Sequence, residues 1–524
     1  MNKIMIVLFA CLCLMSLFAE TTCFTDQCIF PKWLFSFIVL GLMGIVFSIV
    51  AIVGRKMYWN FRTVSIIIVI LCYIEIGIGV LQLFGVIFPE SYCYKMVGSF
   101  DNPAGFASCL CAGSPFALSF LKNPFDKLRW LGYSFLFFSL IAIVLSGSRA
   151  GLVSFFCIIV FHLIYLYRQQ ILLRKRTFLF GCMLIIGFSI FVFSIYHFKK
   201  DSADGRFFIW KCTWEMIKDK PVMGHGIGAF DKYYMEYQSD YFKKYPNSKY
   251  AMLADNVKHP FNEYLLMGVQ LGVVSWVLLI GCVIFLIHCY KKYPSDERYI
   301  SLLVLSSIAV FSLFSYPFTY PFIAIITILC IITIVANTYH IGYLNKNWIR
   351  FELAGCMLIA SLFGLCKIWE RVNAELEWKQ VVELSTLGET DEMLNKYGEL
   401  MSSLGDNPYF LYNYTTALYL AGEYKECLFV AEQCRSYWAD YDLELVLAGG
   451  YKELELYGEA EKHLKIAYNM CPVRFVPLYE LMLLYQDTGE REKAIYIARE
   501  ILKKTIKVNS NKVKFIKQEA SKLI

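Results

Sequence analysis

Apolar segments of near membrane-spanning length dominate the first 370 residues and constrain the fold more than any other feature. A spanning helix needs about 20 mainly apolar residues. Eleven segments approach or exceed that length, namely 4–19, 33–53, 64–88, 103–120, 130–147, 150–167, 178–196, 263–289, 300–316, 318–336 and 351–369. We therefore predict an all-α, polytopic membrane protein of about eleven helices. The first segment is either a retained helix or a signal peptide, since Lys3 precedes a short apolar run.

Composition supports a membrane protein and excludes several other classes. Hydrophobic residues make up 58% of the chain and charged residues only 18%, against about 25% charged in soluble domains. This composition excludes a disordered chain, a fibrous repeat and a small disulfide scaffold. The net charge of +7 does not indicate nucleic acid, because Lys and Arg collect in the cytoplasmic loops of membrane proteins. Cys23 and Cys28 share one short loop, and the sequence leaves open whether they form a disulfide.

Lysine and arginine in the short loops predict the orientation. One set of alternate loops carries 16 of them and the other set, with Lys32, Lys95 and Arg149, carries 3. Positive charge favours the cytoplasmic side, so we expect a cytoplasmic N-terminus. The long loop of about 197–262 and the chain after 370 then face outside. The expected domains are a transmembrane domain at 1–370 and an outer domain at 371–524.

The tail after residue 370 is soluble in composition and repetitive. Gly-Glu pairs begin at Gly388, Gly422, Gly458 and Gly489 with spacings of 34, 36 and 31 residues, and helical patterns flank them. Asn407-Pro408 and Cys471-Pro472 are expected to open helices. A period near 34 resembles the tetratricopeptide repeat (TPR), so we predict a C-terminal α-solenoid. Such an array either only stabilises the protein or offers a concave surface to a partner or to the catalytic loop.

Four polar motifs are expected at the outer face. They are Gly98–Ala107 around Asn102-Pro103, the turn Leu145–Gly151 with Arg149, the run from Gly205 through Arg206 and Trp210 to the Gly224–Phe230 turn, and His259–Leu265 with Asn262 and Glu263. Each motif is weak alone, because glycine turns and helix caps are common. Taken alone, Arg149 fits an interfacial cation, Arg206 a solvated loop residue and His259 a helix cap. His225 is expected to be a packed turn residue, and Glu75 to be paired with a neighbouring helix.

In this order the four motifs resemble the O-antigen ligase family. The family also includes O-antigen polymerases and bacterial protein O-oligosaccharyltransferases, and the resemblance covers roughly residues 60–340. It implies a helical membrane glycosyltransferase fold of the lipid-sugar (GT-C) type in the bacterial inner membrane. The long loop and the domain at 371–524 would then lie in the periplasm, where the transfer takes place. It also implies a donor glycan on undecaprenyl diphosphate and an acceptor that is lipid A-core or a protein hydroxyl. The sequence departs from the family in having Pro-Ala at 103–104 where members often have Pro-Asn, and eleven predicted helices where twelve are common.

The residues themselves suit that chemistry. A departing diphosphate needs cations, and the planar guanidinium matches phosphate oxygens, so Arg149 and Arg206 are the predicted diphosphate ligands. An attacking hydroxyl needs a base near neutral pH, a role for His259. Asn102, Trp210, Asn262 and Glu263 are the expected supporting residues. Lys211, Lys218 and Lys220 either hold the donor phosphates or face anionic lipid. Neither a metal nor a cofactor is implied, since the outer loop carries no Asp-x-Asp pattern.

Three functions remain open on the sequence alone. The favoured hypothesis is a ligase or protein oligosaccharyltransferase that transfers a whole glycan in an inverting displacement. The second is a polymerase that joins repeat units on the carrier. The third is a non-catalytic scaffold or transporter for envelope polysaccharide, with the tail docking a protein partner. If the tail serves only the acceptor, deleting residues 378–524 should reduce acceptor use and spare donor binding.

Overall fold

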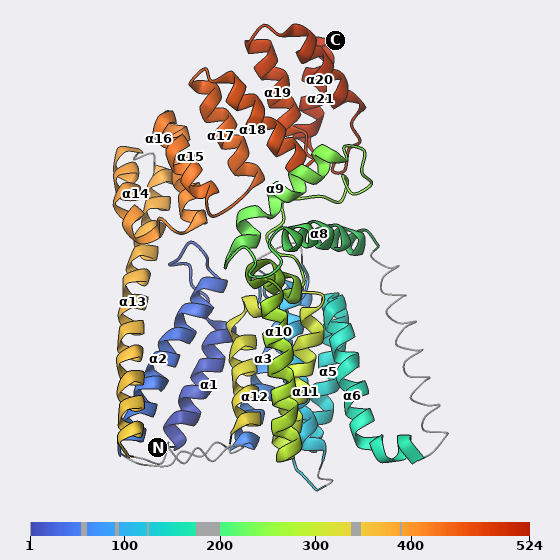
Figure 1. Cartoon of the computed structure of the whole chain (residues 1–524), viewed down its shortest axis with the longest axis vertical. Helices are drawn as coiled ribbons and strands as arrows, with labels where there is room; N and C mark the ends of the chain where they lie inside the picture. Colours follow the sequence, from blue (N-terminus) through green and yellow to red (C-terminus); the bar gives the residue numbers. More distant parts are fainter. Residues whose placement is uncertain are drawn as a thin grey trace. The chain divides into compact units, whose positions relative to one another are not determined.

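The computed structural model describes residues 2–53, 60–89, 94–122, 125–173, 200–336, 347–387 and 390–524. Every regular element in these ranges is a helix, which confirms the predicted all-α fold. The predicted helix at 178–196 lies outside the described residues. Contacts divide the chain into two compact units, unit 1 (1–197 and 278–376) and unit 2 (198–277 and 377–524). Figure 1 shows the helices of both units along the chain.

Unit 1 contains the apolar helices. They are α1 (Asn2–Phe18), α2 (Ile29–Val53), α3 (Phe61–Leu83), α4 (Pro103–Leu118), α5 (Arg129–Ser146), α6 (Arg149–Leu173), the second half of α10 (Glu263–Lys292), α11 (Asp296–Ser312), α12 (Pro321–Val335) and most of α13 (Asn347–Leu387). Seven helices of the described ranges are long and apolar enough to cross a membrane, and α1 and α12 are shorter apolar helices. The protein is therefore a multi-pass membrane protein, as predicted.

Small residues make α4 the central helix of unit 1. Nearly the whole of α4 is buried, and it packs against α3, α5, α6, α11 and α12. A Cβ added to Gly113 would lie 2.7 Å from the Sγ of Cys72, and one added to Gly105 would lie 2.6 Å from the ring of Tyr320. Helices in a membrane gain from such close approach, because apolar burial alone does not distinguish protein from lipid.

The other helices belong to unit 2. They are α8 (Lys200–Asp219), α9 (Ala229–Lys244), the first half of α10, the end of α13, α14 (Thr390–Leu404), α15 (Pro408–Ala421), α16 (Tyr424–Arg435), α17 (Tyr441–Glu453), α18 (Tyr457–Met470), α19 (Val476–Asp487), α20 (Arg491–Lys503) and α21 (Asn511–Leu523). From α15 onward, successive helices pack as the pairs α15–α16, α17–α18 and α19–α20. The short connections make each pair an antiparallel hairpin.

The turns of the tail follow the predicted pattern only in part. Gly422 and Gly489 adopt left-handed φ values of +81° and +76° between paired helices, a conformation that glycine permits. Gly458 instead lies within α18, and the preceding turn uses Glu455 at φ +60°. Asn407 caps α15 as expected, whereas Pro472 follows the end of α18 and does not open a helix. Gly388 lies outside the described residues, and the assignment of the tail to the tetratricopeptide type stays a prediction.

In unit 1 the structure differs from the sequence-based expectations for Lys32 and Glu75. Lys32, placed in an outer loop, lies buried within α2, where its Nζ donates to the carbonyl of Ser99 at 2.5 Å. Glu75 accepts from the backbone N–H of Ser99 at 2.9 Å and from its hydroxyl at 2.5 Å. Ser99 precedes α4, so the partner of Glu75 is a connecting segment and not a neighbouring helix. Cys23 and Cys28 are both free thiols.

Candidate functional site

The first half of α10 begins at one of the predicted motifs. Asn262 is the residue before the helix, and its Oδ1 accepts the backbone N–H of Leu265 at 3.0 Å, which satisfies one of the free donors of the first turn. Phe261 has a left-handed φ of +53°, uncommon for a residue with a side chain. The chain therefore turns sharply between the half-buried His259 and Glu263, the first residue of α10.

Two residues of α8 contact this turn. Trp210 donates its Nε1 hydrogen to the carbonyl of Pro260 at 2.9 Å. One turn earlier on the same helix, the guanidinium of Arg206 lies 5.0 Å from the centre of the Phe261 ring, within range of a cation–π interaction. The structure thus brings together five predicted residues, Arg206 and Trp210 from α8 and His259, Asn262 and Glu263 from the turn.

A polar groove opens beside Arg206. Its volume is about 740 Å³, within the 300–1,000 Å³ range of ligand sites. Four cations line it, Lys200, Arg206, Lys249 and Lys507, together with the carboxylates of Asp201 and Asp204. The excess of positive charge favours an anionic ligand. The sequence predicted Arg206, which lies in a motif, but not the three lysines. Lys200 lies outside the motif that begins at Gly205, and Lys249 and Lys507 are distant from Arg206 in the chain.

The other lysines proposed for α8 make different contacts. The Nζ of Lys211 lies 4.8 Å from the ring centre of Tyr241, and Lys218 pairs with Glu215 at 2.9 Å. Neither Lys211, Lys218 nor Lys220 lines the groove. Of the two alternatives left open, phosphate ligands or lipid-facing cations, the first finds no support in the groove geometry.

The glycine turn supports α10 and does not line the groove. The backbone N–H groups of His225 and Gly226 donate to the carbonyls of Val269 and Gln270 at 2.7 and 2.9 Å. These acceptors precede the break in α10 at Gly272, which has φ +64° and ψ −161°. The Nε2 of His225 lies 2.8 Å from the carbonyl of Met216, so His225 is the packed turn residue that the sequence suggested.

Asn102 and Arg149 lie in unit 1. Asn102 caps α4, accepting from Ala104 at 2.8 Å and Gly105 at 3.1 Å, and its Nδ2 donates to the hydroxyl of Tyr320 at 2.7 Å. Arg149 is the first residue of α6. The start of α6 packs on α4, because a Cβ added to Gly151 would lie 2.7 Å from that of Ala107. The two predicted residues therefore begin adjacent helices.

The tail of unit 2 holds the loop segment that leads to His259. Arg474 pairs with Asp255 at 2.9 Å, and the Nδ2 of Asn256 donates to Asp440 at 2.7 Å. The Nζ of Lys258 lies 4.8 and 5.2 Å from the ring centres of Tyr409 and Trp438. We call these contacts the tail clamp, defined by Asp255, Asn256 and Lys258 of the loop with Tyr409, Trp438, Asp440 and Arg474 of the tail.

A shared hydrophobic core reinforces the tail clamp. α9 packs against α18 (Figure 1), and Tyr234, Met235 and Phe242 of α9 join Tyr441 and Met470 of the tail in one buried cluster. The buried Gln238 donates both to the carbonyl of Asp255 at 2.9 Å and to that of Met470 at 2.6 Å. The tail and the loop are therefore one folded body.

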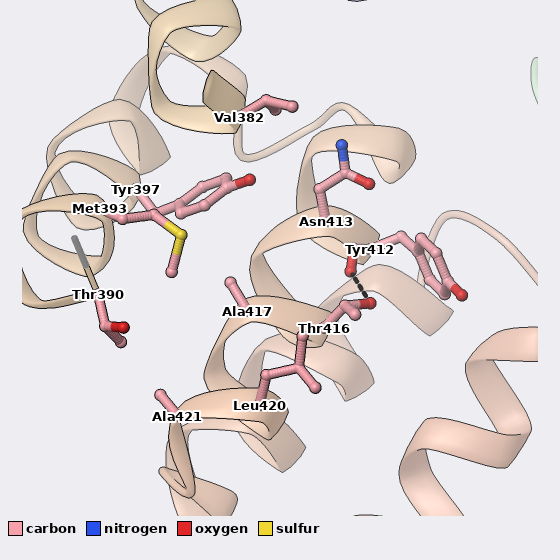
Figure 2. A pocket seen from close by; sticks show the side chains of 10 residues that line it. All are labelled: Val382, Thr390, Met393, Tyr397, Tyr412, Asn413, Thr416, Ala417, Leu420 and Ala421. Atoms are coloured by element: carbon pink, nitrogen blue, oxygen red, sulfur yellow. Dashed lines mark hydrogen bonds between the residues drawn. The ribbon is translucent and has the colours of Figure 1, made fainter. Parts of the chain in front are cut away.

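A second cavity, of about 340 Å³, lies within the tail itself. Figure 2 shows Met393 and Tyr397 of α14 on one side and Tyr412, Thr416 and Leu420 of α15 on the other. Its lining contains no charged side chain. It therefore lacks the positive charge that favours an anionic ligand, and the groove beside Arg206 is the better candidate for an anion-binding site.

Comparison with known proteins supports the predicted family. The model of one protein family, described as O-antigen ligase, matches residues 134–280. A search of curated proteins finds no match. The matched segment includes Arg149, Arg206, Trp210, His259, Asn262 and Glu263 and is shorter than the resemblance at 60–340. The match at residues 134–280 therefore supports the predicted resemblance to the O-antigen ligase superfamily over that part of the chain.

Proposed function

We propose that this protein is a membrane glycosyltransferase that moves a glycan from undecaprenyl diphosphate to an acceptor hydroxyl on lipid A-core or on a protein. The observation that carries the proposal is the cationic groove beside Arg206, whose wall at Phe261 belongs to the same turn as His259. Transfer from a lipid diphosphate needs cations for the leaving diphosphate and a base for the acceptor hydroxyl.

In the proposed reaction the acceptor hydroxyl attacks the anomeric carbon of the donor sugar. His259 takes the hydroxyl proton as the new carbon–oxygen bond forms. The bond from the anomeric carbon to the diphosphate breaks, and the diphosphate leaves with the electron pair. Arg206 stabilises its growing negative charge through charge-assisted hydrogen bonds. The sequence motifs alone assign the same role to Arg149. A single displacement inverts the anomeric centre, and no metal is needed in this scheme.

The supporting residues act on the geometry of the site. Trp210 holds Pro260 and thereby the turn that carries His259. Asn262 caps the first turn of α10 and sets where that turn ends. Asn102 organises the start of α4 together with Tyr320, and Glu263 begins α10 beside the proposed base. Each of these four is a positioning residue in the proposal.

Complementation of a deletion strain tests the activity. His259→Ala should reduce transfer about 10²–10⁴-fold, as loss of a general base typically does, and Arg206→Ala should reduce it about 10²–10³-fold. Lys218→Ala is the matched control, since Lys218 pairs with Glu215 away from the groove. Envelope glycans and glycoproteins are compared on gels and by mass spectrometry.

The pattern of products separates the remaining alternatives. Loss of long lipopolysaccharide with intact carrier-linked polymer indicates a ligase, and single repeat units on the core indicate a polymerase. Loss of protein glycosylation with normal lipopolysaccharide indicates an oligosaccharyltransferase. Wild-type products from both His259→Ala and Arg206→Ala would refute the enzyme and favour a scaffold.

The proposed site requires the groove to face the periplasm of the inner membrane. The positive charge of the alternate short loops supports this orientation. Alkaline phosphatase fused after Lys244 should be active, because that enzyme needs the oxidising periplasm, whereas a fusion after Lys292 should be inactive. An inactive fusion after Lys244 and an active one after Lys292 would show that the topology is the opposite of the predicted one. That result would exclude a periplasmic transfer.

A further inference from the structure

Lys507 is the member of the groove lining that the tail contributes. The other lining residues lie between positions 200 and 261, so almost 250 residues of sequence separate Lys507 from its nearest neighbour in the lining. It lies in the connection between α20 and α21 and is exposed to solvent. A cation at the wall of a groove that already holds Arg206 adds to its attraction for an anion.

The connection that carries Lys507 is anchored at both ends. On the α20 side, Lys504 donates to the carbonyl of Arg474 at 3.0 Å, and Lys517 donates to the carbonyls of Leu502 and Lys504, also at 3.0 Å. On the α21 side, the hydroxyl of Ser510 accepts the N–H of Val513 at 3.3 Å and caps the helix. The backbone around Lys507 is therefore held in place.

Other cations of the tail near the loop have structural partners. Arg474 pairs with Asp255 and lies 3.8 Å from Asp442. Arg435 pairs with the buried Glu444 at 3.0 Å. Lys504 is packed over the rings of Tyr468 and Phe475, and burial lowers its pKa to about 8. Lys507 is the tail cation that lines the groove.

The tail clamp and the shared core keep Lys507 beside the loop. Arg474 links the loop directly to the connection that carries Lys507. Its side chain binds Asp255 of the loop, and its carbonyl accepts a hydrogen bond from Lys504. The position of Lys507 relative to Arg206 is thus set by the folded body of unit 2 and does not depend on a flexible linker. A ligand in the groove meets cations from both parts of the chain.

We propose that Lys507 is a ligand-binding residue of the transfer site and binds a diphosphate group together with Arg206, Lys200 and Lys249. The tail then completes the site and is more than a separate docking surface. This inference rests on the proposed function, and it adds a residue that lies outside the segment matched by the family. The diphosphate belongs either to the lipid carrier or to free pyrophosphate.

Binding to the full-length protein in phosphatidylcholine nanodiscs tests the inference. The probes are undecaprenyl diphosphate placed in the nanodisc and inorganic pyrophosphate in solution. Lys507→Ala should raise the Kd about tenfold, the loss expected for one hydrogen bond to a charged group. Lys507→Glu should raise it further, and Lys507→Arg should restore near wild-type binding. Added salt should narrow these differences, since an exposed charge is screened.

The control is Lys503→Ala, which removes a neighbouring exposed lysine of α20 that does not line the groove. If Lys507→Ala weakens binding of undecaprenyl diphosphate alone, Lys507 recognises the lipid carrier. If it weakens binding of both probes, Lys507 recognises any diphosphate. The inference would be overturned if the Lys507→Ala and Lys503→Ala variants bound both probes with the same Kd. Arg206→Ala run in parallel separates the two proposals, because its failure to weaken binding would remove the groove from the proposed function itself.

Discussion

Two glycines decide how the glycine turn and α10 meet. A Cβ on Gly224 would lie 2.5 Å from the carbonyl carbon of Gln270, and one on Gly272 would lie 2.2 Å from the carbonyl oxygen of Val222. Both residues have positive φ, at +68° and +64°. Backbone thus approaches backbone at both positions, and no side-chain rotation can relieve a clash with backbone atoms.

Replacement of either glycine is expected to destabilise unit 2. Gly224→Ala or Gly272→Ala should lower the free energy of unfolding by at least about 1–3 kcal/mol, the usual cost of a strained backbone conformation, with the clash adding to it. Gly458→Ala is the control, because its Cβ would meet nothing within 4 Å in α18. Thermal unfolding in detergent measures the effect, and equal midpoints for Gly224→Ala and Gly458→Ala would contradict this account.

At the scale of elements, the connection from Trp438 to Tyr441 fastens α17 to the loop that leads to His259. Asp440 has two functions there. Its Oδ1 caps α17 through Asp442 at 2.8 Å and Leu443 at 3.3 Å, and its Oδ2 accepts from Asn256 at 2.7 Å. Asp440 is 1% exposed, and its loss leaves three N–H donors, of which Leu443 is buried and Asn256 and Asp442 are half-buried, without this acceptor.

Two substitutions of Asp440 separate these functions. Asp440→Ala should cost about 0.5–2 kcal/mol for the lost cap and a further ~1–3 kcal/mol for the unpaired amide of Asn256. Asp440→Asn should cost less, since its amide oxygen still caps α17. Unfolding and protease cleavage near residue 256 measure both effects. If Asp440→Ala resisted the protease as well as the wild type does, this part of the tail clamp would not hold the loop.

At the scale of the whole molecule, two units share one chain, and each is built from segments distant in sequence. Unit 2 joins the loop of 198–277 to the tail of 377–524. Its core contains aromatic residues of α9 and residues of α17 and α18. Removing the tail therefore exposes apolar side chains of the loop to solvent.

Deletion of residues 378–524 is consequently expected to reduce donor binding as well as acceptor use. The expectation from the sequence, that donor binding would be spared, assumed a tail that is separate from the loop. Deletion of 518–524 alone is the control, since it leaves Lys517 and the capped start of α21 in place. Limited proteolysis of residues 198–277 and binding of undecaprenyl diphosphate measure the outcome. Intact donor binding in the longer deletion would refute the structural role of the tail.

Local patterns were sufficient to predict much of this protein. Apolar runs predicted the apolar helices of the described ranges, because a spanning helix needs only a continuous apolar stretch. The largest difference is α13, which continues to Leu387, 18 residues beyond the predicted end at 369. The cap Asn102 was recognisable for the same reason, since a cap acts on backbone groups two or three residues away. For α10 the sequence offered His259 as the cap, whereas Asn262 accepts the N–H of Leu265. Arg206, Trp210 and His259 were found as members of short motifs, and the structure brings their segments together.

The associations between distant segments were decided only by the tertiary structure. Nothing in the local pattern of Lys249 or Lys507 distinguishes it from other exposed lysines, and the groove exists because α8, the loop and the tail pack together. The tail clamp joins Asp255 to Arg474 across 219 positions. The sequence by itself determined most of the helical segments and which of them are apolar and long enough to cross a membrane, because these properties follow from neighbouring residues. The tertiary structure decided which side chains share a groove, because packing brings distant residues into contact.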